Sequence, residues 1–350
     1  MANSLIKKYR AYKDWKRVVW NGGSKFKIPF SKKLKYAIRG FSANEYVWYN
    51  FEKNDYREYI SEYDRWKSRD INGQYKFVLD DKLIFEEVVG QYVKVPTNYA
   101  WIEDGIVYGL HDNGMNNDNI TDYLKQYKKT VLKWNGRGGG EGTYVIAFEN
   151  NRFYVNEEER EADYIISLFS RPGNAILCEY MHQSSFASSL YPHTTNTIRI
   201  VCAKKKGERD AKFIVGIQRV GCEQSIPVDN VSSGGLTLDI DSKTGELGEG
   251  IAKYGKKERV LVPFKCHPDT GEPFVGKRIP NWDKLIEEVV SLTNKLPYLN
   301  FVAWDILLTD DGFCVIEGNA SSGCALFQMK HGVKNSELGD IYRSYKVFDN

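Results

Sequence analysis

The stretch 301–319, FVAWDILLTDDGFCVIEGN, predicts two β-strands joined by a tight turn. Apolar and β-branched residues fill both halves, and the DDG at 310–312 supplies the residues that tight turns favour. Three oxygen-bearing side chains interrupt the hairpin, Asp305 on the first strand and Glu317 and Asn319 on the second. Since side chains two apart on a strand share a face, Glu317 and Asn319 point the same way.

These three side chains have the chemistry of a magnesium site. Mg²⁺ prefers oxygen ligands and keeps positions open for water and phosphate. If Asp305 pairs near Glu317 and Asn319, three such ligands converge on one rigid surface. The alternative is a hairpin whose polar residues face solvent, and the spacing alone leaves both interpretations open.

The composition is that of an ordinary globular protein. The chain has 350 residues, 42% of them hydrophobic and 27% charged, with a net charge of +3, so we expect no nucleic-acid partner. Its six cysteines are far apart and form no CxxC, which predicts a reducing compartment. We find no secretory signal and no apolar run of about 20 residues, so we expect a cytoplasmic protein.

The N-terminal 40 residues are strongly basic, with twelve Lys and Arg against one acid, Asp14. In residues 4–20, SLIKKYRAYKDWKRVVW, apolar and aromatic residues recur at helical spacing while Lys and Arg fill the other face. Such a helix suits the surface of an anionic membrane. Alternatively it docks on the protein by its aromatic stripe, with its charges simply solvated.

A glycine-rich segment follows the predicted strand 130–133. Residues 135–142, NGRGGGEG, hold five glycines, and two more strands follow. Glycines expose backbone N–H groups that no side chain blocks, and Lys133 and Arg137 add fixed charge, so the segment predicts a phosphate lid. It is not a Walker A loop, because it lacks GxxxxGK[ST] and a strand follows it. A flexible surface turn is the alternative.

Other segments complete a mixed α+β pattern. The SANE sequence at 42–45 is a capping box and predicts a long helix that reaches Trp66. Buried strands are predicted at 175–180, 197–203 and 213–220. A Ser/Gly loop that begins at Asp229 either closes over an acceptor or is a plain turn.

The order of these parts resembles the ATP-grasp superfamily over roughly residues 80–328. A lysine near the start of a small domain, a strand lysine before a glycine-rich lid, an apolar strand ending in Glu, and a strand Asp followed by Glu-x-Asn come in that superfamily's order. Within it the chain looks most like the sugar-transfer-associated ATP-grasp proteins of bacterial surface-polysaccharide gene clusters. The segments that carry this resemblance are GFSANEY (40–46), HTTNTIRIV (193–201), VDNVSSGG (228–235), HPDTGEPFVGKRIPNW (267–282) and AWDILLTDDGFCVIEGN (303–319).

The resemblance implies an α+β fold of the ATP-grasp type. A small central α/β lid domain would carry the glycine-rich loop, and a C-terminal antiparallel-sheet domain would carry the metal site. The expected parts are a basic N-terminal helical region at 1–75, a central segment at 76–128, a lid subdomain at 129–182 and a catalytic subdomain at 183–350.

The resemblance also implies a site for ATP and Mg²⁺. Lys82 and Lys133 match the two lysines that reach the ATP phosphates, and Asp305, Glu317 and Asn319 match the metal ligands. The segment after the strand at 175–180 matches the one that holds adenine, with Gln183 as a candidate for the ribose. The expected nucleotide-binding residues are Lys82, Lys133, Arg137, Gly138, Gly139, Gly140, Gly142, Glu179, Tyr180, His182 and Gln183.

One departure concerns the reaction itself. Many ligases of the superfamily carry an Arg two residues before the metal Asp, and here that position is Ala303. Arg199 and Arg219 can substitute from neighbouring strands, or each is a solvent-exposed strand charge. Asn196, just before Arg199, is the third catalytic candidate.

The resemblance implies an ATP-dependent carboxylate–amine ligase that works through an acyl phosphate. Its partners would be an amino acid or other small acid and an amine-bearing acceptor. The subgroup alone suggests that the acceptor is a cell-surface glycan precursor, and the basic N-terminus fits a membrane-proximal one. The alternatives are a phosphotransferase that acts on a hydroxyl and a nucleotide-binding scaffold without turnover. The sequence does not predict an oligomeric state.

Overall fold

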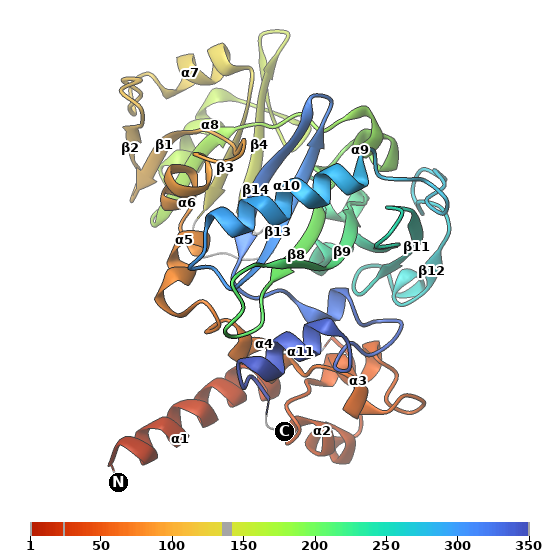
Figure 1. The fold of residues 1–350 in the computed structure, drawn as a ribbon. Coiled ribbons are helices and arrows are strands. Elements are labelled where there is room, and N and C mark those ends of the chain that lie inside the picture. The colour runs from red at the N-terminus through yellow and green to blue at the C-terminus, as the bar shows by residue number, and fades with distance from the viewer. Residues whose placement is uncertain (1, 24, 135–141, 349–350) are drawn as a thin grey trace.

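The computed structural model describes residues 2–23, 25–134 and 142–348 and contains two seven-stranded antiparallel sheets (Figure 1). The α+β prediction is therefore confirmed. The first sheet takes its strands from residues 98–179 and the second from residues 198–319. Within the described ranges no helix is long and apolar enough to cross a membrane. The boundaries predicted at 75, 128 and 182 stay predictions.

The first sheet has the order β2-β1-β7-β3-β4-β5-β6. Helices α7 (Ile120–Tyr127) and α8 (Ala162–Phe169) bury their apolar sides against one face of it, together with Leu132. The opposite face carries a small apolar cluster around Val131 and Ile176. Its strands are β1 (Asn98–Glu103), β2 (Ile106–Gly109), β3 (Lys129–Trp134), β4 (Thr143–Glu149), β5 (Arg152–Val155), β6 (Glu158–Arg160) and β7 (Asn174–Glu179).

The second sheet has the order β12-β11-β10-β9-β8-β13-β14. The long helix α10 (Trp282–Lys295) lies across one face, and α11 (Glu337–Ser344) contributes to the core on the other (Figure 1). Its strands are β8 (Ile198–Ala203), β9 (Lys212–Val220), β10 (Leu236–Ile240), β11 (Leu247–Ala252), β12 (Pro263–Phe264), β13 (Phe301–Thr309) and β14 (Gly312–Asn319).

The hairpin predicted at 301–319 forms as expected. Strands β13 and β14 pair antiparallel, and Asp305 lies directly opposite Glu317. Gly318 lies between the two predicted ligands of β14 and packs closely against Leu79. A Cβ at this position would lie only 2.7 Å from Cδ2 of Leu79. The segment before α6 (Lys82–Val89) therefore sits directly against the end of this hairpin.

The N-terminal region is helical but more broken than the sequence predicted. The capping box of Ser42 and Glu45 is present, yet α3 (Ala43–Trp48) ends after six residues. The prediction of a helix reaching Trp66 is wrong because Asn50 adopts a left-handed backbone with φ of 48°. The tyrosines that recur along this stretch instead form an aromatic cluster with Phe51.

The remaining helices are short. The α-helices are α1 (Ala2–Trp15), α2 (Phe30–Ala37), α4 (Glu62–Ser68), α5 (Phe77–Asp80) and α9 (Ser185–Leu190). A π-helix, η1 (Lys16–Trp20), continues α1. Single 3₁₀ turns are η2 (Tyr56–Glu58), η3 (Gly73–Lys76), η4 (Glu223–Ser225), η5 (Val231–Ser233), η6 (Lys257–Arg259) and η7 (Cys324–Leu326).

Helix α1 docks on the protein near its C-terminal end. The indole of Trp15 donates to the carbonyl of Ala37 at 2.7 Å, and Val19 in η1 is buried. Towards the N-terminus, Leu5 and Tyr9 are 68% and 59% exposed. Figure 1 shows this part of α1 extending away from the two sheets.

Candidate functional site

A cavity of about 750 Å³ lies between the two sheets. One wall comes from β3, β4 and the end of β7, and the other from β8, β9, β13 and β14. The start of α6, the connection between β9 and β10 and the residue after β11 also contribute to the lining. This volume is typical of a site for a small-molecule ligand or cofactor.

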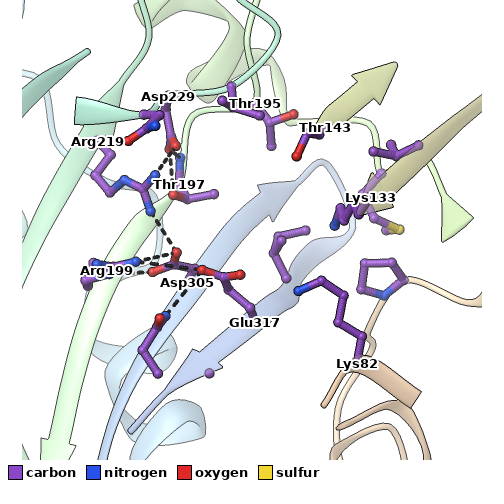
Figure 2. A pocket seen from close by; sticks show the side chains of 18 of the residues that line it. Lys82, Lys133, Thr143, Thr195, Thr197, Arg199, Arg219, Asp229, Asp305 and Glu317 are labelled. Atoms are coloured by element: carbon purple, nitrogen blue, oxygen red, sulfur yellow. Dashed lines mark hydrogen bonds and ion pairs between the residues drawn. The ribbon is translucent and has the colours of Figure 1, made fainter. Parts of the chain in front are cut away.

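The buried carboxylate of Asp305 accepts hydrogen bonds from two arginines (Figure 2). Arg199 donates from Nε to Oδ1 at 2.6 Å and from Nη2 to Oδ2 at 2.7 Å. Arg219 donates from Nη1 to Oδ2 at 2.7 Å. The strand register brings these three side chains together. Arg199 on β8 lies opposite Asp305 on β13, and Arg219 comes from β9, the next strand along.

The same network continues to a second buried acid. Arg219 also donates from Nη2 to Oδ1 of Asp229, whose Oδ2 accepts from the backbone N–H and hydroxyl of Thr197 at 2.7 and 2.6 Å. Two carboxylates and two guanidinium groups thus share one desolvated cluster. The alternative that Arg199 and Arg219 are solvent-exposed strand charges is wrong, since their side chains are only 12% and 13% exposed.

The charges of this cluster separate the pKa values of its acids. Burial raises the pKa of Asp305, but Arg199 and Arg219 outweigh it, and the pKa falls to about 2. Burial also raises the pKa of Asp229, and there the opposing charge of Arg219 does not reverse the shift. Asp305 is therefore ionised at neutral pH and holds both arginines in place.

The residues predicted as metal ligands share the β13–β14 hairpin. Glu317 is more open than Asp305, with a side chain 43% exposed, and Asn319 Nδ2 lies 3.3 Å from its Oε1. That contact leaves Oδ1 of Asn319 available as a metal ligand. The carboxylate of Asp305 has about four lone-pair directions and uses three of them for arginine N–H groups.

These three residues fit a magnesium ion by donor chemistry, since two carboxylates and one amide oxygen are hard ligands. The predicted ligands include only two carboxylates, and among the described residues no group of three or more His, Cys, Asp and Glu is placed to hold a metal. An ion here would need Asn319, water or phosphate oxygens to complete its shell.

Both predicted phosphate-binding lysines reach the cavity. Lys82 is the first residue of α6, whose N-terminus is capped by Asp81 through hydrogen bonds of 3.0 Å from the N–H groups of Leu83 and Ile84. Lys133 comes from β3 on the opposite sheet. Figure 2 shows the two side chains on the same side of the cavity, opposite the arginine cluster.

The predicted adenine segment is only partly at the cavity. Glu179 and Tyr180 line it, and Met181 adds an apolar surface to theirs. His182 is exposed, and its ring packs edge-on against Tyr180 rather than lining the cavity. Gln183 is absent from the cavity lining, because its side chain donates to the carbonyl of Tyr191 and accepts from a backbone N–H group.

Asn196 does not reach the cavity either. It is 1% exposed, and its Oδ1 accepts from the hydroxyl of Thr194 and the N–H of Gly221. Its Nδ2 donates to the carbonyls of Ala187 and Tyr191. Its side-chain hydrogen bonds join α9, the loop before β8 and the residue after β9, and they leave no group directed at the cavity.

The predicted lid lies mostly outside the described residues. Arg137, Gly138, Gly139 and Gly140 fall in the segment 135–141, which the structure does not describe. Gly142 is described: it has φ of 77°, and its carbonyl accepts from the N–H of Trp134 at 3.1 Å.

Several residues of the cavity carried no clear sequence signal. They are Thr143, Thr195, Thr197, Asp229 and Lys253. Asp229 lies in the VDNVSSGG segment, but the sequence indicates no role for its carboxylate. A threonine or a lysine next to a strand is common in any protein, so only the tertiary structure distinguishes these.

A family model described as sugar-transfer associated ATP-grasp matches residues 63–339. No curated protein matches the sequence.

Solved structures with a similar fold have low sequence identity to the chain. D-alanine–D-alanine ligase from Helicobacter pylori is 12% identical with a TM-score of 0.42, over 76% of this chain and 61% of that one. The ADP complex of PurK, N5-carboxyaminoimidazole ribonucleotide synthetase, is 13% identical with a TM-score of 0.39, over 71% and 46%. The ATP-grasp ligase PsnB with precursor peptide PsnA2 and AMPPNP is 12% identical with a TM-score of 0.32, over 72% and 54%. The chain therefore spans between 46% and 61% of the length of these three proteins.

Proposed function

Given that the chain belongs to the sugar-transfer associated ATP-grasp family, we propose that it is an ATP-dependent ligase that joins a carboxylic acid to an amine through an acyl phosphate. One observation carries the proposal. Two lysines and the Asp305–Glu317–Asn319 set, which come from both sheets and from α6, line a single cavity. Positive charge beside hard oxygen ligands is the arrangement that a nucleoside triphosphate and its metal require.

The nucleotide would lie between the sheets. The phosphates would approach Lys82 and Lys133, and the base would lie among the apolar side chains of Val131, Met181 and Ile316 at the same cavity. The backbone of the segment from Glu179 to Met181 would supply its hydrogen bonds. Apolar walls exclude water and strengthen the attraction between lysine and phosphate.

The first chemical step would phosphorylate the acid. A carboxylate oxygen attacks the γ-phosphorus, the bond from that phosphorus to the β–γ bridging oxygen breaks, and ADP leaves. Lys82 and Lys133 offset the negative charge that spreads over the phosphate oxygens. The chain's contribution is positioning and charge stabilisation rather than a covalent intermediate.

The second step would form the amide. The amine attacks the acyl carbon, the carbon–oxygen bond to phosphate breaks, inorganic phosphate leaves, and the amine releases a proton. Nη1 of Arg199 has no hydrogen-bond partner among the described residues, and Arg199 lines the cavity. We assign to this N–H group the anion-stabilising role that Ala303 cannot fill. Arg219, which links Asp305 to Asp229, is a positioning residue.

Magnesium would be held by Glu317, Asn319 and the remaining lone pair of Asp305. When bound, it would neutralise phosphate charge and orient the γ-phosphate for displacement. The three side chains are held by the hairpin register and, at Asp305, by the two arginines.

The acceptor would be an amine on a cell-surface glycan precursor, and the protein would act in the cytoplasm at an anionic membrane. The family's association with sugar transfer supports the first statement. The second is supported by α1, where Leu5, Ile6, Tyr9 and Tyr12 are between 49% and 68% exposed beside basic residues. Phe30 of α2 and Ile38, which directly follows that helix, are also exposed. Apolar groups beside Lys and Arg are the composition that partitions to an anionic interface.

Product analysis tests the proposed reaction against its alternatives. The purified protein is incubated with Mg·ATP and panels of small acids and amines, and ADP, phosphate and organic products are measured together. A ligase releases ADP and phosphate in equal amounts, only when both an acid and an amine are present. A phosphorylated product without free phosphate would identify a phosphotransferase instead. Nucleotide binding without any turnover across the panels would favour a scaffold.

A further inference from the structure

Lys253 is a buried lysine that the proposed nucleotide site does not use. It directly follows β11, is 8% exposed and lines the cavity between the sheets. Its Nζ lies 4.8 Å from the ring centre of Trp48. No hydrogen bond or ion pair joins this ammonium to another residue in the described part of the chain.

A buried ammonium without a paired carboxylate is costly to keep charged. Burial lowers the pKa of Lys253 to about 8, with Arg199 and Arg65 acting in the same direction and Glu62 and Glu45 opposing them. These acids are themselves engaged elsewhere: Glu62 pairs with Arg65, and Glu45 closes the capping box of α3. The counter-charge that Lys253 lacks within the protein can therefore come from a ligand in the cavity.

The N-terminal helical region packs against the residues that form this end of the cavity wall. Lys25 donates to the carbonyl of Ser232 at 3.4 Å, which ties the region to the cavity-lining loop before β10. Trp48 packs edge-on against Tyr254, the neighbour of Lys253. Its Nε1 is buried and has no hydrogen-bond partner among the described residues. Lys253 and Ser232 thus add polar groups to the cavity lining from elements other than α6 and β3, which carry the two phosphate-binding lysines.

We propose that Lys253 anchors a negatively charged group, a carboxylate or a phosphate, of the substrate that is not the nucleotide. This inference rests on the proposed function, because it assumes that Lys82 and Lys133 hold the nucleotide phosphates. It deepens that function by naming a property of the substrate. The acid or the acceptor carries an anionic group in addition to the atom that reacts, and a charge-assisted hydrogen bond to Lys253 selects for it.

Competitive trace acetylation of the full-length protein tests this assignment. Acetic anhydride is applied at pH 8, and peptide mass spectrometry gives the modification rates of Lys253, Lys82, Lys133 and Lys257. The rates are compared without ligand, with saturating Mg·AMPPNP, and with Mg·AMPPNP plus either succinate or inorganic phosphate. Ionic strength is matched with KCl. Lys257 lies four residues away on the exposed turn η6 and serves as the internal control.

We expect Mg·AMPPNP alone to leave Lys253 reactive, and one of the two anions to slow its acetylation at least threefold without affecting Lys257. The anion that protects indicates whether the group is a carboxylate or a phosphate. Complete protection by Mg·AMPPNP alone would overturn the inference, because Lys253 would then belong to the nucleotide site. The inference would also be overturned if neither succinate nor phosphate protected Lys253.

Failure of the proposed nucleotide site has a different signature. Lys82 and Lys133 would then keep their reactivity when Mg·AMPPNP is added, whatever happens at Lys253. A Lys253→Arg variant keeps the charge and should retain an anion-dependent change in total tryptophan fluorescence, to which Trp48 beside Lys253 contributes, whereas Lys253→Met should lose it. An equal change in both variants would also contradict the role of the charge.

Discussion

At Asp305, one carboxylate of 3% exposure faces two guanidinium groups from different strands. An exposed ion pair of this kind would contribute little to stability. In a buried pair, removing one partner leaves the other charge buried without a counter-charge, which is strongly destabilising. The residue therefore has two separable roles, holding Arg199 and Arg219 and contributing an oxygen to the proposed metal site.

Replacing this carboxylate should affect both roles. We expect Asp305→Asn to lower ATP turnover at least 100-fold and to reduce the free energy of unfolding by about 3 kcal/mol, since two buried arginines lose their counter-charge. Urea unfolding and ADP release measure the two effects. Asp239→Asn is the matched control, because that carboxylate lies in the same sheet in an exposed ion pair with Lys330. A wild-type unfolding curve for Asp305→Asn would refute the structural role.

The lowered pKa of Asp305 also predicts a pH dependence. Because its folded pKa of about 2 lies below the ordinary value, the ionised carboxylate favours the folded state. That contribution, on the order of 2 kcal/mol, is present at neutral pH and is lost as pH falls from about 4 towards 2. Urea unfolding between pH 6 and pH 3 should show wild type losing stability faster than Asp305→Asn. Parallel curves would contradict this.

Within the β13–β14 hairpin, the carboxylate of Asp305 is buried, whereas that of Glu317 is partly exposed. Glu317 is opposite Asp305 in register but faces the cavity with 43% of its side chain exposed. We expect Glu317→Gln to change the free energy of unfolding by less than about 1 kcal/mol and to raise the Mg²⁺ concentration for half-maximal ATP turnover at least tenfold. Magnesium titrations of wild type and variant measure this. An unchanged requirement would remove Glu317 from the metal site.

Helix α1 is the second element with a distinct prediction. We expect the double change Leu5→Ser and Tyr9→Ser to weaken sedimentation with phosphatidylglycerol vesicles at least fivefold and to leave ATP turnover unchanged, since both side chains are exposed and far from the cavity. Vesicles of phosphatidylcholine alone are the lipid control. If the wild type does not bind phosphatidylglycerol at all, the membrane proposal is wrong.

Local sequence signals predict one of these elements correctly and another wrongly. The hairpin at 301–319 was predicted because a run of apolar and β-branched residues and a DDG turn are local signals. The long helix predicted from the capping box at 42–45 is wrong, because α3 ends at Trp48 and the tyrosines beyond it pack in an aromatic cluster around Phe51. Periodicity reports which residues are buried, and it does not report whether Asn50 between them adopts a left-handed conformation.

At the scale of the whole molecule, the cavity exists only because the two sheets face each other. Lys133 comes from the first sheet, Lys82 from α6 and Glu317 from the second sheet, so a nucleotide held by all three would contact both sheets at once. A ligand that binds only the folded arrangement stabilises it by mass action, by about 2.7 kcal/mol at 100 times its Kd.

Mg·ADP should therefore raise the melting temperature in a concentration-dependent way. We expect Lys82→Met and Lys133→Met each to reduce this shift to less than half, because each removes one charge that faces the phosphates. Differential scanning fluorimetry measures the shift. Lys125→Met, on the exposed surface of α7, should behave as wild type. A full shift in both cavity variants would exclude these lysines from the nucleotide site.

The order of strands, turns and charged residues follows from the sequence alone, and it was enough to identify the family. It also predicts Lys82, Lys133, Asp305, Glu317 and Asn319 as site residues. These follow from local patterns and from short motifs. Only the tertiary structure decided that Arg199 and Arg219 are buried on one carboxylate, that Asn196 supports a loop, and that Lys253 lines the cavity. Burial and pairing depend on which distant strands meet in register, and no local pattern specifies that meeting.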